Sequence, residues 1–312
     1  MTAFNTQVLT DAEADKLLKK QGYVVLPFLN DEEVSELKSV FLQIKEGELT
    51  EFYATAHAKD VEFRKKMSEY VRKAFQRSFD LYFENYQLLG GSFITKRSHS
   101  NQILQPHQDW NIVDENRFRS YNIWVPLLDL NETNGAIQVL PGSHNWLPTY
   151  RHASIPCVFE SVHPLILTHM LSLHLKAGEA LIYDHALLHA SEANLSETDR
   201  IACACGTIPI DAQMQFYWNN DGNIEAYASS PDFFMCEDVF SGPHGLKKLG
   251  NLTYSFPKVN EVDFYKLSGI IPPPVEDNHT NDFISDSSSK TWWQTYTPIN
   301  IFREIKFRLI GK

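Results

Sequence analysis

The chain has 312 residues, of which 43% are hydrophobic and 12% aromatic. That length suits one large domain or two small ones, and we expect a single domain over residues 1–312. The formal net charge of −11 argues against a nucleic-acid-binding protein, which needs a basic face, and no apolar run reaches the length of a membrane-spanning helix.

The cysteines indicate the cellular compartment. Cys157, Cys203, Cys205 and Cys236 form neither a C-x-x-C pair nor a dense framework, so we expect reduced thiols. No basic segment followed by an apolar run is found near the start of the chain, so no secretory signal is predicted. Together these features predict a cytoplasmic protein.

The first ninety residues read as helices around one short strand. Thr10 and Glu13 have capping-box spacing, which predicts a helix to residue 20 that ends at Gly22. Residues 23–28 read as a strand, and Asn30 then caps a second helix. Between residues 50 and 86, apolar side chains recur every four positions, which predicts a helix packed on the outside of a sheet.

From residue 88 onward the pattern changes to short strands separated by turns. We expect strands at residues 92–96, 121–128, 137–140, 172–175, 180–183 and 201–208. Asn134-Gly135 and Pro141-Gly142 supply turns between them, and a hairpin follows at residues 215–227. Many short strands joined by turns predict a β-sandwich or barrel.

Residues 105–110 hold the strongest chemical motif. His107 and Asp109 are two residues apart, so on an extended strand both side chains point to the same face. A second imidazole from His189 would complete two histidines and one carboxylate. That donor set leaves metal positions open for a co-substrate and O₂, as non-haem Fe(II) requires.

The third ligand has a rival in His185, four residues before His189. The spacing from His189 to Arg200 and the intervening Ser191 and Asn194 favour His189, which leaves His185 as a packed imidazole beside the metal. Arg200 is far enough along the chain to return on a neighbouring strand. Its guanidinium would clamp a dicarboxylate through two parallel hydrogen bonds.

Three motifs in this order resemble the phytanoyl-CoA dioxygenase family of Fe(II)/2-oxoglutarate-dependent oxygenases. They are His107-Gln108-Asp109, Asn134-Gly135 followed by Pro141-Gly142-Ser143-His144, and His189-x-Ser-x-x-Asn-x-Ser-x-x-x-Arg200. The resemblance covers roughly residues 10–210. It implies a mainly β protein with flanking helices and a double-stranded β-helix core, also called a jelly-roll or cupin-like core.

The resemblance also implies the roles of the site residues. Fe(II) would be held by the catalytic ligands His107, Asp109 and His189. The co-substrate 2-oxoglutarate would pair with Arg200, and Ser191 would add a hydroxyl contact. Ser92 and Trp124 stand at about the positions that line the 2-oxoglutarate pocket in the family, although a strand serine and a core tryptophan are equally compatible with the sequence.

The implied reaction is hydroxylation of a small organic molecule by O₂, with release of succinate and CO₂. A metabolite, an amino acid, an acyl chain and a natural-product intermediate are all possible substrates. Halogenating relatives carry a small residue in place of the aspartate, so Asp109 favours hydroxylation. Desaturation or epoxidation with the same cofactors, and a non-catalytic cupin-like binding protein, remain as alternatives. The oligomeric state, monomer or homodimer, stays open.

Residues 211–312 extend beyond the last motif and are rich in aromatic side chains. We expect part of this extension to pack on the core and to form a wall or lid on the substrate side, with an outer layer or a dimer contact as the alternative. Residues 272–289 read as a mobile loop. Residues 301–310 are amphipathic and basic and would dock on a membrane, on a partner, or on the domain itself.

Overall fold

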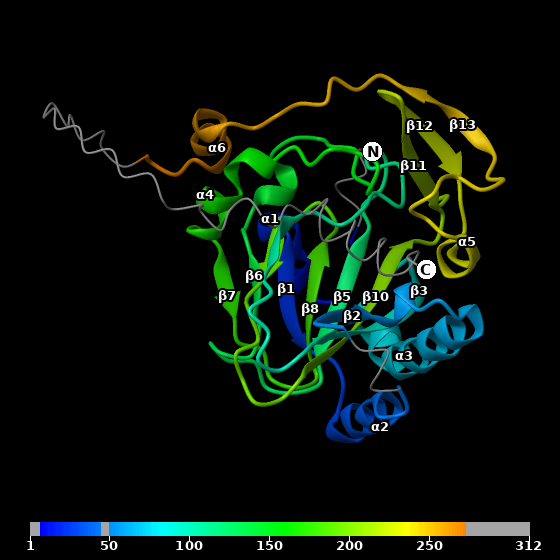
Figure 1. Ribbon diagram of the computed structural model, residues 1–312, viewed down its shortest axis with the longest axis vertical. Coiled ribbons are helices and arrows are strands. Elements are labelled where there is room, and N and C mark those ends of the chain that lie inside the picture. The colour runs from blue at the N-terminus through cyan, green and yellow to red at the C-terminus, as the bar shows by residue number, and fades with distance from the viewer. Residues whose placement is uncertain (1–6, 45–49, 273–312) are drawn as a thin grey trace, which may run out of the picture.

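The computed structural model describes residues 7–44 and 50–272 of the chain. Two antiparallel sheets form the centre of the molecule (Figure 1). In spatial order, the six-stranded sheet consists of β1 (Tyr23–Pro27), β8 (Glu179–Asp184), β5 (Tyr121–Pro126), β10 (Arg200–Pro209), β3 (Tyr86–Lys96) and β2 (Phe52–Ala54). The four-stranded sheet consists of β4 (Leu104–His107), β9 (His189–Ser191), β6 (Ile137–Val139) and β7 (Leu171–Leu173).

This architecture confirms the predicted fold, a mainly β protein with a jelly-roll core and flanking helices. The helices are α1 (Ala12–Gln21), α2 (Asp31–Phe41), α3 (Val61–Tyr82), α4 (His163–Leu167), α5 (Pro231–Cys236) and α6 (Glu261–Ser268). The described residues also include the short 3₁₀ turns η3 (Thr55–His57), η4 (Ser143–Asn145) and η5 (Glu160–Val162). None of the helices in the described ranges has the length and apolarity that crossing a membrane requires.

The helix ends follow the capping chemistry of the sequence, with two corrections. The cap of α1 is Asp11 and not Thr10, because the Asp11 carboxylate accepts the Ala14 N–H at 2.8 Å. Gly22 ends α1 with a φ of +85°, as predicted. The helix predicted from residue 50 begins only after Asp60, whose carboxylate caps it, and β2 and η3 precede it.

The two faces of the six-stranded sheet pack against different partners. Its outer face contributes Val24, Phe93, Ile123, Ile182 and Cys203 to the core shared with α1, α2 and α3. Its inner face carries Trp124, Leu181 and Tyr183, which pack with Ile137 and Val139 of the opposing sheet. Because strand residues alternate between faces, the same strands present apolar surface to the helices and a lining to the barrel interior.

The described part of the extension forms a third sheet of β11 (Gln215–Asn220), β12 (Asn223–Ala228) and β13 (Lys248–Leu252), followed by α6. The predicted hairpin is confirmed: β11 and β12 pair through a turn in which Asp221 and Gly222 have φ values of +49° and +89°. The predicted loop from residue 273 to 289, the basic segment 301–310 and the aromatic residues Trp292, Trp293 and Tyr296 lie outside the described residues.

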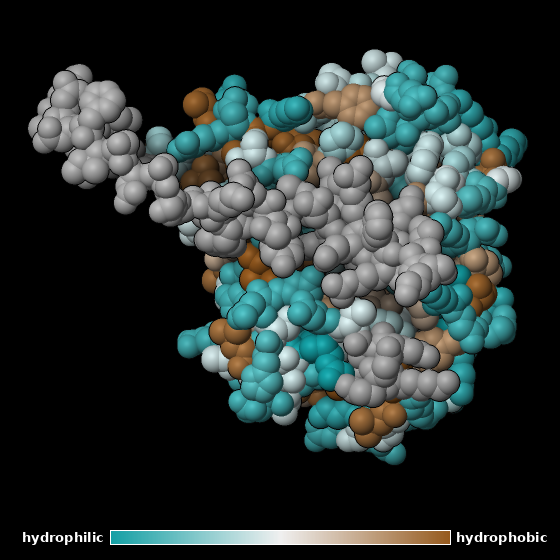
Figure 2. Space-filling view, in the orientation of Figure 1, coloured by the Kyte–Doolittle hydropathy of each residue, from teal (hydrophilic) through white to brown (hydrophobic). Residues whose placement is uncertain are grey.

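Where Figure 2 shows described residues, they are mostly hydrophilic, with brown apolar groups among them. The four cysteines are free thiols, as predicted.

Candidate metal centre

The pairing of β4 with β9 brings the two predicted histidine ligands together. His107 lies directly opposite His189, and their ring centroids are 4.2 Å apart. The register shifts between Leu104 and His107, so β4 carries one extra residue relative to β9. Such a β-bulge re-aims side chains. The proline at position 106 has no N–H to donate and suits that irregularity.

Asp109 reaches the same point from just outside the sheet. The expectation that His107 and Asp109 share one strand is wrong, because β4 ends at His107. The Asp109 backbone is held instead by buried Arg151, whose Nε donates to the Asp109 carbonyl at 2.7 Å. Arg151 is in turn paired with Glu115 through Nη1 at 2.9 Å and through Nη2.

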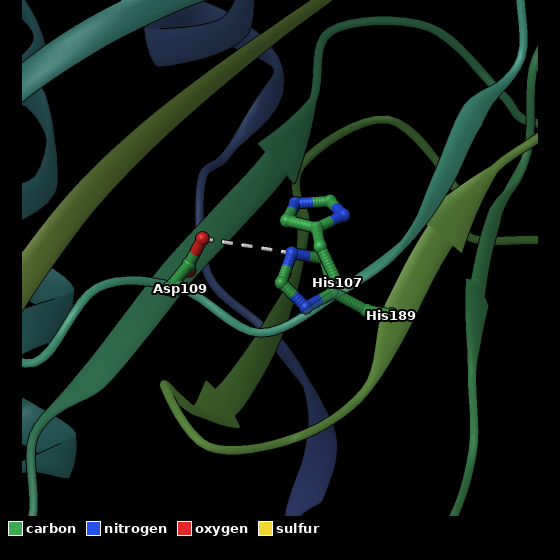
Figure 3. Close-up of side chains that lie close together, drawn as sticks. All are labelled: His107, Asp109 and His189. Carbon is green, nitrogen blue, oxygen red and sulfur yellow. Dashed lines mark ion pairs between the residues drawn. The ribbon is translucent and has the colours of Figure 1, made fainter. Parts of the chain in front are cut away.

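The three side chains form a compact donor set (Figure 3). One ligand atom from each of His107, Asp109 and His189 lies within 4.8 Å of the others. The His189 Nε2 atom is 3.7 Å from Asp109 Oδ1. In the described part of the chain this is the one cluster of histidine, cysteine or carboxylate groups with a spacing that suits a metal ion.

Hydrogen bonds fix which ring nitrogen each histidine presents. His107 Nδ1 bonds to the Gln105 carbonyl at 2.8 Å, and His189 Nδ1 bonds to the Leu187 carbonyl at 3.0 Å. A carbonyl accepts only from N–H, so both Nδ1 atoms carry the proton and both Nε2 atoms are free to bind a metal. Burial, followed by the neighbouring His189, lowers the pKa of His107 to about 3, which keeps it in the neutral form that metals bind.

The Asp109 carboxylate is oriented by two donors on the same oxygen. Its Oδ2 accepts from Tyr183 Oη at 3.0 Å and from Asn122 Nδ2 at 3.1 Å. Burial acts to raise the pKa of Asp109, but the imidazoles of His189 and His185 outweigh it and hold that pKa below its usual range. The group is therefore an anion at neutral pH, as a metal ligand must be.

His185 lies outside the donor set. Its Nδ1 is 2.8 Å from Ser120 Oγ, and the ring is buried behind Asp109. Burial lowers the pKa of His185, so the ring stays neutral. This placement agrees with the packed imidazole expected for His185.

Two buried basic side chains, here called the cation pair, lie on neighbouring strands of the six-stranded sheet. Arg200 on β10 stands opposite Lys96 on β3. Arg200 is 2% exposed, and its Nε has no hydrogen-bond partner among the described residues. Its guanidinium carbon is 5.3 Å from the centre of the Trp124 ring, so Trp124 is a platform for the cation. Burial lowers the pKa of Arg200 to about 10, which leaves it charged at neutral pH.

Lys96 is a residue that the sequence analysis missed. Its Nζ donates to Ser191 Oγ at 2.8 Å, to the Ser191 carbonyl at 3.2 Å and to the Glu192 carbonyl. Burial, and then the charge of Arg200, lower the pKa of Lys96 well below its usual value. The available signal was a lysine within the predicted strand at residues 92–96, on the same face as Ser92.

The remaining predicted pocket residues divide into two groups. Ser191 and Trp124 contact the cation pair directly, through Lys96 and Arg200 respectively. Ser92 faces the barrel interior, but its hydroxyl is 3.2 Å from Thr55 Oγ1 and accepts the Ala56 N–H at 3.1 Å. The side chain of Ser92 is therefore engaged by η3, away from Arg200.

The Pro-Gly-Ser-His turn supports the site without entering it. Ser143 Oγ donates to the Leu140 carbonyl at 2.7 Å and accepts the Leu188 N–H at 2.9 Å. The turn thereby fixes the residue that precedes His189. The turn therefore has a structural role.

Aromatic side chains from the extension gather around Trp110 and His152. The Trp110 ring lies 4.4 Å from His152 and 5.5 Å from Phe240, and His152 also lies 4.7 Å from Phe216 and 5.6 Å from Trp218, all between centroids. Burial lowers the pKa of His152 to about 3, so this cluster is neutral. We call these five residues, 110, 152, 216, 218 and 240, the aromatic wall.

Comparisons with known proteins agree with this geometry. The family model "Phytanoyl-CoA dioxygenase (PhyH)" matches residues 18–202, which is more than half of the chain. A Dictyostelium discoideum protein, "Phytanoyl-CoA dioxygenase domain-containing protein 1 homolog", is 26% identical over 141 residues, which cover 43% of this chain and 50% of that protein. The chain thus spans half the length of this curated relative.

One solved structure shares the fold, and a second gives a lower score. A non-heme alpha-ketoglutarate-dependent carbocyclase from nogalamycin biosynthesis superposes with a TM-score of 0.50 at 20% identity, covering 69% of this chain and 88% of its own. EctD from S. alaskensis, solved with 2-oxoglutarate and 5-hydroxyectoine, gives a TM-score of 0.45 at 17% identity, covering 65% and 78% respectively. The family match and the motif order lead to one assignment: the chain belongs to the phytanoyl-CoA dioxygenase family.

Proposed function

We propose that this protein is an Fe(II)- and 2-oxoglutarate-dependent dioxygenase that hydroxylates a small organic molecule. The observation that carries the proposal is the placement of a two-histidine, one-carboxylate donor set beside a buried cation pair. His189 belongs to the donor set, and Ser191, two residues farther along β9, accepts a hydrogen bond from Lys96 of the cation pair. Two residues of strand rise about 6.6 Å, a length that a five-carbon dicarboxylate spans.

The donor chemistry fits iron. A mixed His/Asp set with open positions is typical of non-haem Fe(II), whereas structural zinc sites are closed by four protein ligands. When bound, the metal supplies the activation of O₂ and the oxidation of substrate. His107, Asp109 and His189 would hold it, and the protein's remaining part is to orient the co-substrate and to exclude water.

The cation pair fits the far carboxylate of 2-oxoglutarate. Arg200 is buried, stacked on Trp124, and has an Nε without a partner among the described residues. Lys96, one strand away, brings an amine into the same interior, and burial and the charge of Arg200 disfavour its protonated form. A dianionic co-substrate would favour protonated Lys96 and would gain charge-assisted hydrogen bonds from Arg200.

The aromatic wall favours an uncharged or flat apolar substrate group at the metal. Trp110 follows Asp109 in the chain, and the extension is fastened to the same segment by the Gln215 N–H, which donates to the Ile112 carbonyl at 2.9 Å. Tyr217 Oη donates to the Val113 carbonyl at 3.1 Å. We therefore infer that residues 1–312 act as one domain, with residues 211–272 forming the wall on the substrate side.

Several further features belong to the proposal. Hydroxylation is favoured over halogenation because Asp109 occupies the place that halogenating relatives leave open. Desaturation or epoxidation with the same cofactors is the alternative outcome, and the pose of the substrate at the metal decides between them. We propose a cytoplasmic enzyme, supported by four free thiols. A small-molecule substrate and no nucleic acid are the expected partners, given the net charge of −11.

We propose that 2-oxoglutarate contacts the metal at one end and Arg200 at the other. Calorimetric titration of 2-oxoglutarate into the protein tests this proposal, under anaerobic conditions and with Co(II) in place of Fe(II). We expect tight binding to the wild type, and much weaker binding either without metal or in Arg200→Ala. Equal affinity with and without metal would contradict a co-substrate that touches both ends. A non-catalytic cupin-like protein is separated from the enzyme by succinate formation in the Fe(II) form, which only the enzyme supports.

A further inference from the structure

The Tyr183 phenol lies among the proposed metal ligands without being one of the predicted three. Tyr183 projects from β8 into the barrel and is 3% exposed. Its Oη donates to Asp109 Oδ2 at 3.0 Å and lies 3.4 Å from His189 Nε2. The rings of Tyr183 and His189 are 4.7 Å apart between centroids, so packing fixes both side chains.

Asn122 completes a closed triangle with these groups. It stands opposite Tyr183 in the β5–β8 pair, so strand register delivers both side chains to the same place. Asn122 Nδ2 donates to Tyr183 Oη at 3.0 Å and to Asp109 Oδ2 at 3.1 Å. The amide thus uses both of its N–H groups, while the phenol accepts one hydrogen bond and donates one.

The two carboxylate oxygens of Asp109 have different surroundings. Oδ2 accepts two hydrogen bonds, whereas Oδ1 lies 3.7 Å from His189 Nε2. Binding a metal through both oxygens would compete with the bonds to Tyr183 and Asn122. A second carboxylate oxygen on the metal would also fill a position that the co-substrate or O₂ needs.

We propose that Tyr183, together with Asn122, is a positioning residue that holds Asp109 as a single-oxygen metal ligand. The inference rests on the proposed metal site and goes beyond it, because it assigns a role to a phenol that is not itself a ligand. Groups that orient ligands in this way typically contribute ten- to a hundredfold to metal affinity.

The test compares Tyr183→Phe with a matched control. Tyr23 lies opposite Tyr183 in the β1–β8 pair and faces the same interior, but its hydroxyl makes no hydrogen bond to the ligands within the described ranges. We expect Tyr183→Phe to weaken Co(II) binding, measured by calorimetry without 2-oxoglutarate, about ten- to a hundredfold. Tyr23→Phe should leave Co(II) affinity unchanged. Both variants keep the ring, so their melting temperatures should stay close to that of the wild type.

A double-mutant cycle with Asn122→Ala sharpens the assignment. Tyr183 and Asn122 hold the same oxygen and each other, so their losses of Co(II) affinity should not add. The visible Co(II) spectrum of Tyr183→Phe should also change, because Asp109 is freed to bind through both oxygens.

Four outcomes decide the matter. Weaker and non-additive Co(II) binding with an altered spectrum supports the proposal. Wild-type affinity and spectrum in Tyr183→Phe would overturn it while leaving the metal site standing. A Tyr183-dependent phenolate charge-transfer band in the Fe(III) protein would also overturn it, since the phenol would then be a ligand. Failure of the wild type to bind Co(II) would instead contradict the proposed function.

Discussion

Arg200 lies opposite Lys96 in the β10–β3 pair, and both side chains are buried in the barrel interior. Among the described residues neither side chain forms an ion pair with a carboxylate; Lys96 is held by Ser191 and by a backbone carbonyl of Glu192. Burial and the charge of Arg200 disfavour the protonated form of Lys96. We propose that a bound dianion offsets this effect, and the next three predictions test that proposal.

Replacement of Arg200 should impair co-substrate binding. Arg200→Ala removes the charge-assisted partner of a buried carboxylate, which costs on the order of 2–5 kcal/mol. We expect a sharp rise in the KM for 2-oxoglutarate, and partial rescue in Arg200→Lys because a point charge cannot replace the planar fork. Steady-state kinetics at varied 2-oxoglutarate provide the measurement. An unchanged KM in Arg200→Ala would exclude this role.

Lys96→Met should also raise the KM for 2-oxoglutarate, by several-fold, because it removes a positive charge near the bound dianion. The effect acts through charge, since the three N–H groups of Lys96 are donated to Ser191 and Glu192. The suitable control is Lys176→Met, because Lys176 forms an exposed ion pair with Asp129 at 2.9 Å, remote from the cation pair in the sequence and in its contacts. An unchanged KM in Lys96→Met would show that Lys96 only holds residues 191 and 192 in place and does not affect co-substrate binding.

The cation pair predicts metal-free stabilisation by dicarboxylates. Glutarate has two carboxylates and cannot support the oxidation, so it probes the site alone. We expect glutarate to raise the melting temperature of the metal-free wild type through linkage, with a smaller rise in Arg200→Ala. Acetate at matched ionic strength is the control, because it reports only on general salt effects. Equal shifts with acetate and glutarate would count against a built dianion site.

The ligand assignment is tested by alanine variants. His107→Ala, Asp109→Ala and His189→Ala should each abolish Fe(II)-dependent turnover and weaken Fe(II) binding while the protein stays folded. His185→Ala should retain metal, since His185 bonds to Ser120 and lies outside the donor set. Metal content by atomic absorption, with circular dichroism to confirm folding, gives the answer. Loss of metal in His185→Ala with retention in His189→Ala would reverse the assignment.

Asp184 predicts a pH dependence of stability. Burial raises the pKa of Asp184 to about 6, against the opposing charge of Arg119 at 3.8 Å. The unfolded value is about 3.9, so between these values the folded state binds more protons than the unfolded state. The contribution of this group to stability is therefore fully present below about pH 4, and it is lost as pH rises through 6.

Asp184→Asn should accordingly stabilise the protein more at pH 8 than at pH 5, by about 1.4 kcal/mol. The asparagine oxygen can still accept the Ala186 N–H, which the aspartate accepts at 2.8 Å. Urea unfolding at both pH values measures the difference. The exposed Asp221→Asn at the hairpin tip is the control. An equal gain at pH 5 and pH 8 would contradict the raised pKa.

The sequence was sufficient for the family, the jelly-roll core and the positions of most strands, because alternating side chains and turn residues act locally. Caps such as Asn30 and Gly22 could be read for the same reason. The bulge in β4 could not be predicted from the sequence, because it is defined by the pairing of β4 with β9, which is distant in the chain.

The site residues also differ in whether a local sequence motif could identify them. Spaced motifs pointed to His107, Asp109, His189 and Arg200, whose proposed roles remain to be tested. Lys96 and Tyr183 carry no motif; they gain meaning only through the registers that set Lys96 opposite Arg200 and Tyr183 opposite Asn122. For Ser92, the sequence predicts the strand and the face on which the side chain lies. It does not predict the hydrogen bond to Thr55, because that bond depends on the position of η3.

Succinate formation tests the central claim most directly. The purified protein would be supplied with 2-oxoglutarate, Fe(II), ascorbate and O₂, and succinate would be quantified by mass spectrometry, with and without a chelator. We expect slow, chelator-sensitive succinate formation by the wild type even without the organic substrate, and none by Asp109→Ala. Absence of succinate from a wild-type protein shown to bind both Fe(II) and 2-oxoglutarate would contradict the dioxygenase and favour a binding protein.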